Sequence, residues 1–154
     1  MIRICQSLRS QTAVVMGCCN FDITSTAKGT LLPNGPSNAV QTTSNAGGVG
    51  RNIAEAFSKI VSKRAEKSRV YMLSFIGDDG FGPTVKSSLP EFTASGIRVE
   101  KGKRTGVYNA TFDQDGNIAM AGVDDEINRS CSFELTTKEK DLLSDADQGM
   151  EKHN

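Results

Sequence analysis

Apolar and polar positions along the chain predict strands and helices in alternation. Residues 12–19 form a short, apolar, β-branched run, which predicts a buried strand. Over residues 50–64 the apolar side chains recur at helical spacing, which predicts an amphipathic helix. Residues 69–76 have the pattern of a second buried strand, and a right-handed crossover would place it parallel to the first. The sequence therefore predicts an α/β fold that contains a partial βαβ parallel sheet.

The second half of the chain predicts shorter elements. A helix is expected after Phe81, with Pro90 ending or kinking it, because proline cannot donate its backbone nitrogen within a helix. Residues 97–99 predict a short strand. Residues 105–123 alternate around the turn signal Asp113-Gln-Asp-Gly116, which predicts an antiparallel hairpin. An ordinary edge hairpin would give the same pattern.

The long polar segment between the first predicted strand and helix has no clear period. Residues 25–46 carry glycine and proline, and only Leu31, Leu32 and Val40 suggest short pieces of strand.

Candidate binding residues cluster where the first strand ends and the first helix begins. Asn20 and Asp22 flank Phe21, so an extended backbone would direct both polar side chains to one side. Gly47 and Gly48 lie just before the helix, where a ligand can approach backbone N–H groups that lack an intrahelical partner. Asn52 lies one turn further on. Together they predict a small-molecule site. An aspartate that only stabilises a turn, and a glycine-rich turn that only leads into a core helix, would give the same sequence.

Composition and charge narrow the class of protein. The 154 residues are enough for one domain with a core, and Lys plus Arg equals Asp plus Glu at 18 each. The balanced charge predicts no nucleic-acid partner and no attraction to an anionic membrane. No apolar run approaches the ~20 residues that span a bilayer. We expect a cytoplasmic protein; the Arg- and Ser-bearing residues 1–11 leave a mitochondrial alternative open.

Several common catalytic and metal sites are not supported by the sequence. Cys5, Cys18, Cys19 and Cys131 have no C-x-x-C spacing, so zinc is not expected, and the vicinal pair reads as buried thiols in a reducing compartment. His153 is the only histidine and lies next to the C-terminus, which argues against Ser-His or Cys-His catalysis. The glycine segment also lacks the register of a P-loop or of a dinucleotide-binding fingerprint.

Four segments in order resemble the N-terminal half of a pfkB (ribokinase-like) sugar or nucleoside kinase. The segments are Met16-Gly-Cys-Cys-Asn-Phe-Asp22, Gly47-Gly-Val-Gly-Arg-Asn52, Phe75-Ile-Gly-Asp-Asp-Gly-Phe-Gly82 and Thr105-Gly-Val-Tyr-Asn-Ala-Thr-Phe-Asp-Gln-Asp-Gly116. The resemblance covers residues 12 to 143. Within the family, the second segment looks most like the pseudouridine kinase branch, since ribokinases usually carry a lysine where this chain has Val49.

The resemblance implies a ribokinase-like α/β fold whose hairpin at about residues 105–123 is a lid over the sugar. It implies that the full-length enzyme uses ATP and Mg²⁺ to phosphorylate a ribosyl hydroxyl, and that pseudouridine is the favoured substrate. It also implies substrate contacts from five residues: Asn20, Asp22, Gly47, Gly48 and Asn52.

The family's catalytic aspartate, in a Gly-Ala-Gly-Asp type motif, has no counterpart in this chain. The magnesium-linked Asn-x-x-Glu motif and the nucleotide site belong to the C-terminal half of the family, which the resemblance does not cover. We therefore expect no catalytic residue here, no ATP or Mg²⁺ binding by this fragment, and no activity from it alone. A truncated isoform, a gene-model fragment and a partial clone all remain open.

The expected organisation is an N-terminal extension over residues 1–11, a truncated kinase domain over residues 12–143 and a polar, frayed tail over residues 144–154. An unpaired sheet edge also predicts self-association. The alternative function is a non-catalytic module that at most binds a nucleoside or pairs with another subunit.

Overall fold

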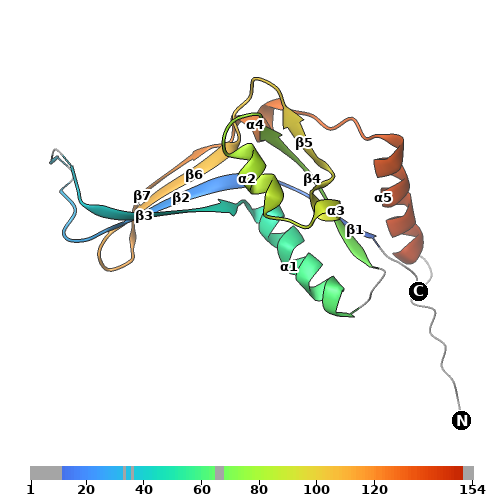
Figure 1. Cartoon of the computed structure of the whole chain (residues 1–154), viewed down its shortest axis with the longest axis horizontal. Helices are drawn as coiled ribbons and strands as arrows, with labels where there is room; N and C mark the ends of the chain where they lie inside the picture. Colours follow the sequence, from blue (N-terminus) through green and yellow to red (C-terminus); the bar gives the residue numbers. More distant parts are fainter. Residues whose placement is uncertain (1–11, 33, 36, 65–67, 151–154) are drawn as a thin grey trace, which may run out of the picture.

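The computed structural model describes residues 12–32, 34–35, 37–64 and 68–150, so the expected extension over residues 1–11 lies outside the described residues. Figure 1 shows two parts that meet end to end: an α/β part that carries the helices, and a long sheet that projects from it. The chain passes between the two parts several times. The candidate site residues belong to the segments that make these passages.

The α/β part contains a three-stranded parallel sheet in the order β1-β4-β5. Strand β1 (Thr12–Met16) pairs with β4 (Arg69–Gly77) from Thr12↔Arg69 to Met16↔Leu73, and β4 pairs with β5 (Ile97–Glu100). β4 is buried from its second residue to its last, as expected for the central strand. The predicted parallel pairing of the first two core strands is confirmed.

The helices have the order that the sequence predicted. Helix α1 (Val49–Arg64) packs on β4 and β1, and α2 (Gly82–Ser87) and α3 (Glu91–Ala94) follow on either side of Pro90. Pro90 therefore ends the first short helix, and its carbonyl accepts the Ala94 N–H at 2.9 Å in the second. None of the helices in the described part of the chain is long and apolar enough to cross a membrane.

Two further helices complete the chain. The short α4 (Glu126–Ser130) contacts β4 and β6, and α5 (Thr137–Met150) packs beside β1. The boundary that we expected at residue 143 falls inside α5, which continues as helix to Met150. Residues 151–154 lie outside the described part of the chain.

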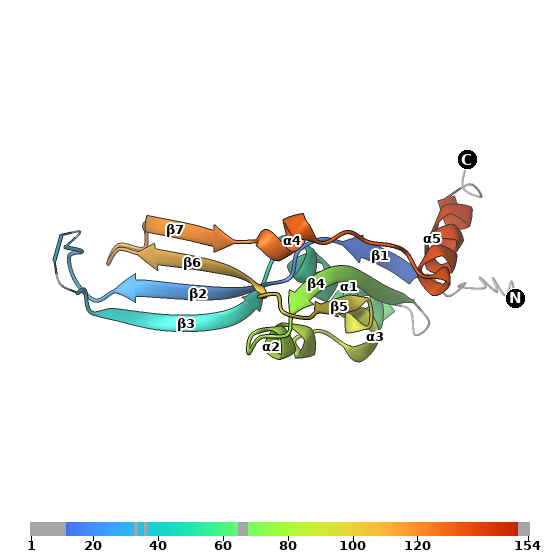
Figure 2. The ribbon, with the colours of Figure 1, turned by 90° about the horizontal axis from the view of Figure 1, so that it is seen from above.

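The projecting sheet has four strands in the order β3-β2-β6-β7. They are β2 (Asn20–Ala27), β3 (Val40–Gly47), β6 (Gly106–Phe112) and β7 (Ile118–Asp124). β2 runs antiparallel to β3 and parallel to β6, and β6 and β7 form the predicted antiparallel hairpin. Figure 2 shows these strands extending beyond the described helices for most of their length.

Two sequence expectations about this region were wrong. The first strand does not continue to residue 19; it ends at Met16, and Asn20 and Asp22 begin a second strand, β2, instead of following the first. Residues 25–46 contain more than the short pieces of strand expected there, because the end of β2 and nearly all of β3 lie within them, and Leu31 and Leu32 belong to neither strand. The hairpin is therefore one half of a four-stranded sheet.

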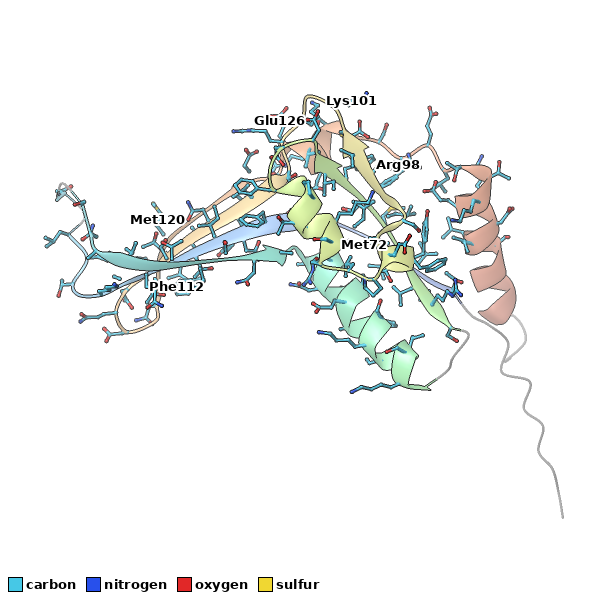
Figure 3. All side chains as sticks on the ribbon, viewed as in Figure 1. Met72, Arg98, Lys101, Phe112, Met120 and Glu126 are labelled. Carbon is cyan, nitrogen blue, oxygen red and sulfur yellow. The ribbon has the colours of Figure 1, made fainter. Side chains whose placement is uncertain are left out.

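The hydrophobic core lies between the parallel sheet and α1 to α3. Met72 and Ala54 are fully buried in it, and Val70, Ile76 and Val85 are close to fully buried. Figure 3 shows Met72 within this part, whereas Phe112 and Met120 lie on the projecting sheet. Full burial of such side chains stabilises a fold by about 1.5–3 kcal/mol each. The core therefore fixes the α/β part, and the projecting sheet is anchored to it at one end.

Helix α1 has an unusual distribution of apolar side chains. The helix buries Arg51 and Ala54, while a stripe of larger apolar residues on it is 45–70% exposed. This outward stripe consists of Val49, Ile53, Phe57 and Ile60. An amphipathic helix normally turns its apolar face inward, and large exposed apolar patches mark contact surfaces.

Candidate substrate-binding site

Asn20 and Asp22 begin β2, where the projecting sheet joins the α/β part. Because side chains alternate along a strand, both residues direct their side chains to the same face, as the sequence predicted. Asn20 lies opposite Gly47 of β3 on one side and opposite Gly106 of β6 on the other. Two neighbouring positions on this face thus carry no side chain, which leaves the Asn20 side chain room between the strands.

The carboxylate of Asp22 lies against Gly47. A Cβ added to Gly47 would overlap the Asp22 carboxyl group, so a larger residue fits at this position only if that carboxyl group moves. Asp22 is partly buried, and its carboxylate accepts no hydrogen bond from the described residues. Burial raises the pKa of Asp22, and the positive charge of Arg51 opposes that rise. Asp22 is a partly desolvated acceptor without a partner in the described part of the chain.

Asn20 is an unsatisfied polar group. Its side chain is 8% exposed, and its Oδ1 is buried without a hydrogen-bond partner in the described part of the chain. The Oδ1 lies next to Gly106, where an added Cβ would come within 2.6 Å of it. Leaving a buried acceptor unpaired costs about 1–3 kcal/mol, so such a group indicates a place where a ligand or water supplies the donor.

The next two glycines of the motif bring α1 close to the β1–β2 connection. Gly48 has φ of +94°, a left-handed conformation that favours glycine, and an added Cβ would lie 2.6 Å from the Cys18 carbonyl oxygen. Gly50 packs on Gly17, where an added Cβ would lie 2.7 Å from the Gly17 backbone. The Arg51 N–H donates to the Cys18 carbonyl at 3.2 Å. The glycines therefore place the start of α1 beside the start of β2.

Asn52 lies in the first turn of α1 and is exposed. Its N–H donates to the Gly48 carbonyl at 2.9 Å, and its side-chain Oδ1 accepts a hydrogen bond from Nη1 of Arg51, also at 2.9 Å. The side-chain Nδ2 donates to none of the described residues and is left for another acceptor. The structure thus gathers Asn20, Asp22, Gly47 and Gly48 directly and holds Asn52 on the adjoining helical turn.

A second set of contacts fixes the base of β6. Asp79 Oδ1 accepts the Thr105 hydroxyl at 2.7 Å and the Gly82 N–H at 3.1 Å, and Oδ2 accepts the Thr105 N–H at 2.9 Å. Burial acts to raise the pKa of Asp79, but these donors together hold it below its ordinary value. Because Thr105 immediately precedes β6, this network fixes where Gly106 meets Asn20.

Phe81 packs on β2, on the face opposite Asn20 and Asp22. Its ring stacks on Phe21 with centroids 4.4 Å apart and an interplanar angle of 14°. Phe21 lies between Asn20 and Asp22 and faces away from them. The turn between β4 and α2 therefore contacts both β2 and the approach to β6, close to the candidate site.

The sequence did not single out Arg51, Gly106, Asp79 or Thr105 for this site. Gly106 depends on the β2–β6 register, and Asp79 and Thr105 are 26 positions apart, so no local pattern joins them. The Gly-Asp-Asp turn was the available signal, because a short carboxylate after a strand often accepts backbone N–H groups.

The described residues hold no other evident chemical centre. No group of three or more His, Cys, Asp or Glu side chains within them is arranged to hold a metal. Burial raises the pKa of the Cys19 thiol to about 11, so Cys19 is a protonated core side chain. A hollow of about 190 Å³ is lined by none of the candidate residues. Its lining residues are Gly102, Lys103, Arg104, Asp124, Glu126 and Ile127.

Solved structures with a similar fold include three kinases. The ribokinase of Arabidopsis thaliana complexed with ribose and ATP superposes with a TM-score of 0.72 at 19% identity, over 89% of this chain and 43% of that one. A carbohydrate kinase from Agrobacterium tumefaciens gives 0.60 at 24% identity, over 76% and 36%. The nucleoside kinase of Methanocaldococcus jannaschii, an archaeal member of the ribokinase family, gives 0.57 at 18% identity, over 74% and 36%.

These similarities show a ribokinase-like α/β fold. The chain spans less than half the length of each of these proteins. None of the curated proteins compared with the chain matches it. The family model for pfkB family carbohydrate kinases matches residues 10–147. Because this match covers most of the sequence, the chain belongs to the pfkB family of carbohydrate kinases.

Proposed function

We propose that this chain is the substrate-binding half of an ATP-dependent kinase that phosphorylates a ribosyl hydroxyl, with pseudouridine as the favoured substrate. The carrying observation is the pair formed by Asp22 and Gly47. A partly buried carboxylate without a donor among the described residues lies over a glycine, and any larger residue there would displace it. Such an acceptor suits a ligand that presents hydroxyl groups.

The proposed contacts follow from the chemistry of each group. Asp22 accepts hydrogen bonds from two ribose hydroxyls, which are strengthened by its charge. Gly47 lets the Asp22 carboxylate lie against its backbone, Gly48 lets the chain turn beside Cys18, and both offer backbone N–H groups to the sugar. Asn52 donates from Nδ2 to a hydroxyl oxygen. Asn20 accepts a further donor through its unsatisfied Oδ1. The projecting sheet then covers the sugar and excludes water, which otherwise competes as phosphoryl acceptor.

The preference for pseudouridine rests on the motif Gly47-Gly-Val-Gly-Arg-Asn52. Its third position is Val49, which is 70% exposed, whereas ribokinases usually carry lysine there. Arg51, two residues later, supplies a buried cation that is hydrogen-bonded to Asn52.

ATP and Mg²⁺ are proposed for the whole kinase and not for this chain. The described residues contain no cluster fit to hold a metal ion, and the sequence has no Gly-x-Gly-Asp segment to supply a base and an anion hole. Phosphoryl transfer depends on positioning and charge stabilisation, which a bound metal ion, a catalytic base and an anion hole provide. We therefore propose that the chain alone binds the substrate without turnover.

A non-catalytic role as a nucleoside-binding or interaction module is the second candidate. It is favoured by the outward stripe of α1 and by β1, which is an edge strand of the parallel sheet. Both features suit a polypeptide that packs on α1 and adds a strand beside β1. In self-association, a second copy of the chain would be that polypeptide.

The free thiols of Cys18, Cys19 and Cys131 suit a reducing compartment, and we propose the cytoplasm, with mitochondria as the alternative.

The test is to measure binding and turnover on the same protein. Saturation-transfer NMR with pseudouridine and with ribose reports binding, and an assay of ADP release with ATP and Mg²⁺ reports turnover. We expect binding that is lost in Asp22→Ala, and no turnover above background. Turnover by this chain would contradict the assignment of catalysis to another segment. Failure of both sugars to bind would contradict the substrate site.

A further inference from the structure

Arg51 is a buried cation at the start of α1, and each of its three guanidinium nitrogens donates a hydrogen bond. Its side chain is 10% exposed. Nε donates to the Ser88 hydroxyl at 3.0 Å, and Nη2 donates to the Ser88 carbonyl at 3.4 Å. Nη1 donates to Asn52 Oδ1 at 2.9 Å and to Glu55 Oε2 at 2.7 Å. Arg51 thereby connects α1 to the end of α2.

The contact with Asn52 determines which end of that amide faces a ligand. The guanidinium only donates, so the Asn52 side chain must turn its oxygen toward Arg51. Turning the amide round would place two N–H groups against a cation. The Nδ2 group is therefore presented as a donor, and the ligand must supply an acceptor there. Asp22, when ionised, only accepts, and the ligand must supply donors to it.

The same cation also acts on Asp22. Of the charged groups near this site, Glu55 is paired with both Arg51 and Lys59, while Asp22 has no cation hydrogen-bonded to it among the described residues. In the β2–β3–β6 register its neighbours are Asn45 and Tyr108, neither of which is a basic residue. Arg51 is thus the nearby charge that favours the ionised carboxylate against partial burial.

We propose that Arg51 is a positioning residue of the sugar site. It fixes which group of the site donates and which accepts: Asn52 donates a hydrogen bond to the ligand, and Asp22 accepts hydrogen bonds from it. The inference rests on the proposed function, because it concerns the same site. It narrows the ligand to one that offers hydroxyl donors to Asp22 and a neighbouring oxygen acceptor to Asn52, which a vicinal diol does. A guanidinium suits the task better than an ammonium, because its planar fork reaches Ser88, Asn52 and Glu55 at once.

Two substitutions separate the two effects without any ligand. Arg51→Lys keeps the charge but loses the fork, and Arg51→Met loses both. In ¹⁵N relaxation, the Asn52 side-chain amide should become mobile in both variants. In a ¹³C-carboxyl titration, the pKa of Asp22 should rise in Arg51→Met and stay near the wild-type value in Arg51→Lys. Glu55→Gln is the matched control, because it neutralises one partner of Arg51 but keeps an acceptor oxygen there, the Arg51 charge and the Asn52 contact. It should leave the Asn52 amide ordered and should not raise the pKa of Asp22.

Pseudouridine binding provides the third readout. Both Arg51 variants should bind about tenfold more weakly, the scale of one hydrogen bond to a charged group, and Glu55→Gln should bind within about twofold of wild type. If Arg51→Met fails to fold, Arg51→Lys still tests the Asn52 contact. An ordered Asn52 amide in a folded Arg51→Lys variant, with binding unchanged, would overturn the inference. A wild-type chain that binds no pseudouridine or ribose would overturn the proposed function, and the two ligand-free readouts would then decide on Arg51 by themselves.

Discussion

The carboxylate of Asp22 lies over Gly47 so closely that a Cβ at residue 47 would overlap it. The two residues come from neighbouring antiparallel strands, β2 and β3, whose register pairs Asn20 with Gly47 and Asp22 with Asn45. Asp22 thus leans toward the junction of the two sheets, where the glycine leaves space. Any side chain at residue 47 has to displace the carboxylate or the strand that carries it.

Gly47→Ala should therefore damage the site more than the fold. The added methyl group meets only the end of the flexible Asp22 side chain, so we expect the free energy of unfolding to fall by about 1 kcal/mol or less, the lower end of overpacking costs. Pseudouridine binding should weaken at least tenfold, because Asp22 has to move. Urea unfolding and an NMR titration measure the two effects. Gly29→Ala is the control, since nothing lies within 4 Å of a Cβ there, and it should alter neither quantity.

Asp22→Ala should weaken binding of pseudouridine by about 1.5–3 kcal/mol, the scale of a hydrogen bond to a charged group. The binding should also fall as the pH drops through the pKa of Asp22, which burial raises above its ordinary value of 3.8. Isothermal titration calorimetry at several pH values measures both. Wild-type affinity in Asp22→Ala would remove this residue from the site.

Asp22 should contribute nothing to folding at neutral pH. Because its pKa is higher in the folded state than in the unfolded state, the folded protein binds the proton more tightly. Stability therefore declines as the pH rises through the interval between the two pKa values. Asp22→Asn should be at least as stable as wild type at pH 7 by thermal unfolding. A clear loss of stability would instead indicate a structural role for the carboxylate.

Asp79 should show the opposite dependence on pH. Its folded-state pKa is lowered, so its contribution to stability is present above the unfolded value of 3.8 and is lost as the pH falls through the lowered folded-state pKa. At pH 7, Asp79→Asn should lower the free energy of unfolding by about 1.5–3 kcal/mol, because the Thr105 and Gly82 donors lose a charged acceptor.

The neighbouring Asp78 provides the control for Asp79. Among the described residues it accepts a single hydrogen bond, from the exposed Gly102 N–H at 3.0 Å, so Asp78→Asn should change the free energy of unfolding by less than about 1 kcal/mol. Equal losses in the two variants, measured by urea unfolding at pH 7, would contradict a special role for Asp79 at the base of β6.

The isolated chain should associate in solution through the outward stripe of α1 and the edge of β1. Phe57 and Ile60 are 48% and 50% exposed, so replacing both with serine should reduce association and leave the core intact. Sedimentation velocity over a range of concentrations measures this effect. Ile118→Ser with Met120→Ser, on the projecting sheet, is the control. A chain that stays monomeric and melts cooperatively would contradict the prediction.

The α/β part was predictable because burial leaves a mark on its sequence. β4 and the core-facing part of β1 are continuous apolar runs, and Pro90 separates the two short helices as its chemistry requires. β2 and β3 were missed because the projecting sheet is covered by helices only at its base. Threonine and serine fill such strands, as in Thr24-Ser-Thr26 and Thr42-Thr-Ser44, so no apolar alternation marks them.

The site was predictable only in part. The family motifs identified Asp22, Gly47, Gly48 and Asn52 as candidates, since these positions belong to recognisable segments. The place of Arg51 was not predictable, because an arginine in the sequence does not reveal that it is buried or that it bonds to Ser88, 37 positions away. Contacts of this kind depend on how α1 and α2 pack.

The most direct test of a sugar site at the junction of the two sheets is a ¹⁵N–¹H correlation spectrum recorded during a titration with pseudouridine. The account predicts that shifts concentrate on Asn20, Asp22, Gly47, Gly48 and Asn52, including the Asn52 side-chain amide, and that they disappear in Asp22→Ala. Shifts centred on the hollow between Gly102 and Ile127, or no shifts at millimolar pseudouridine and ribose, would contradict it.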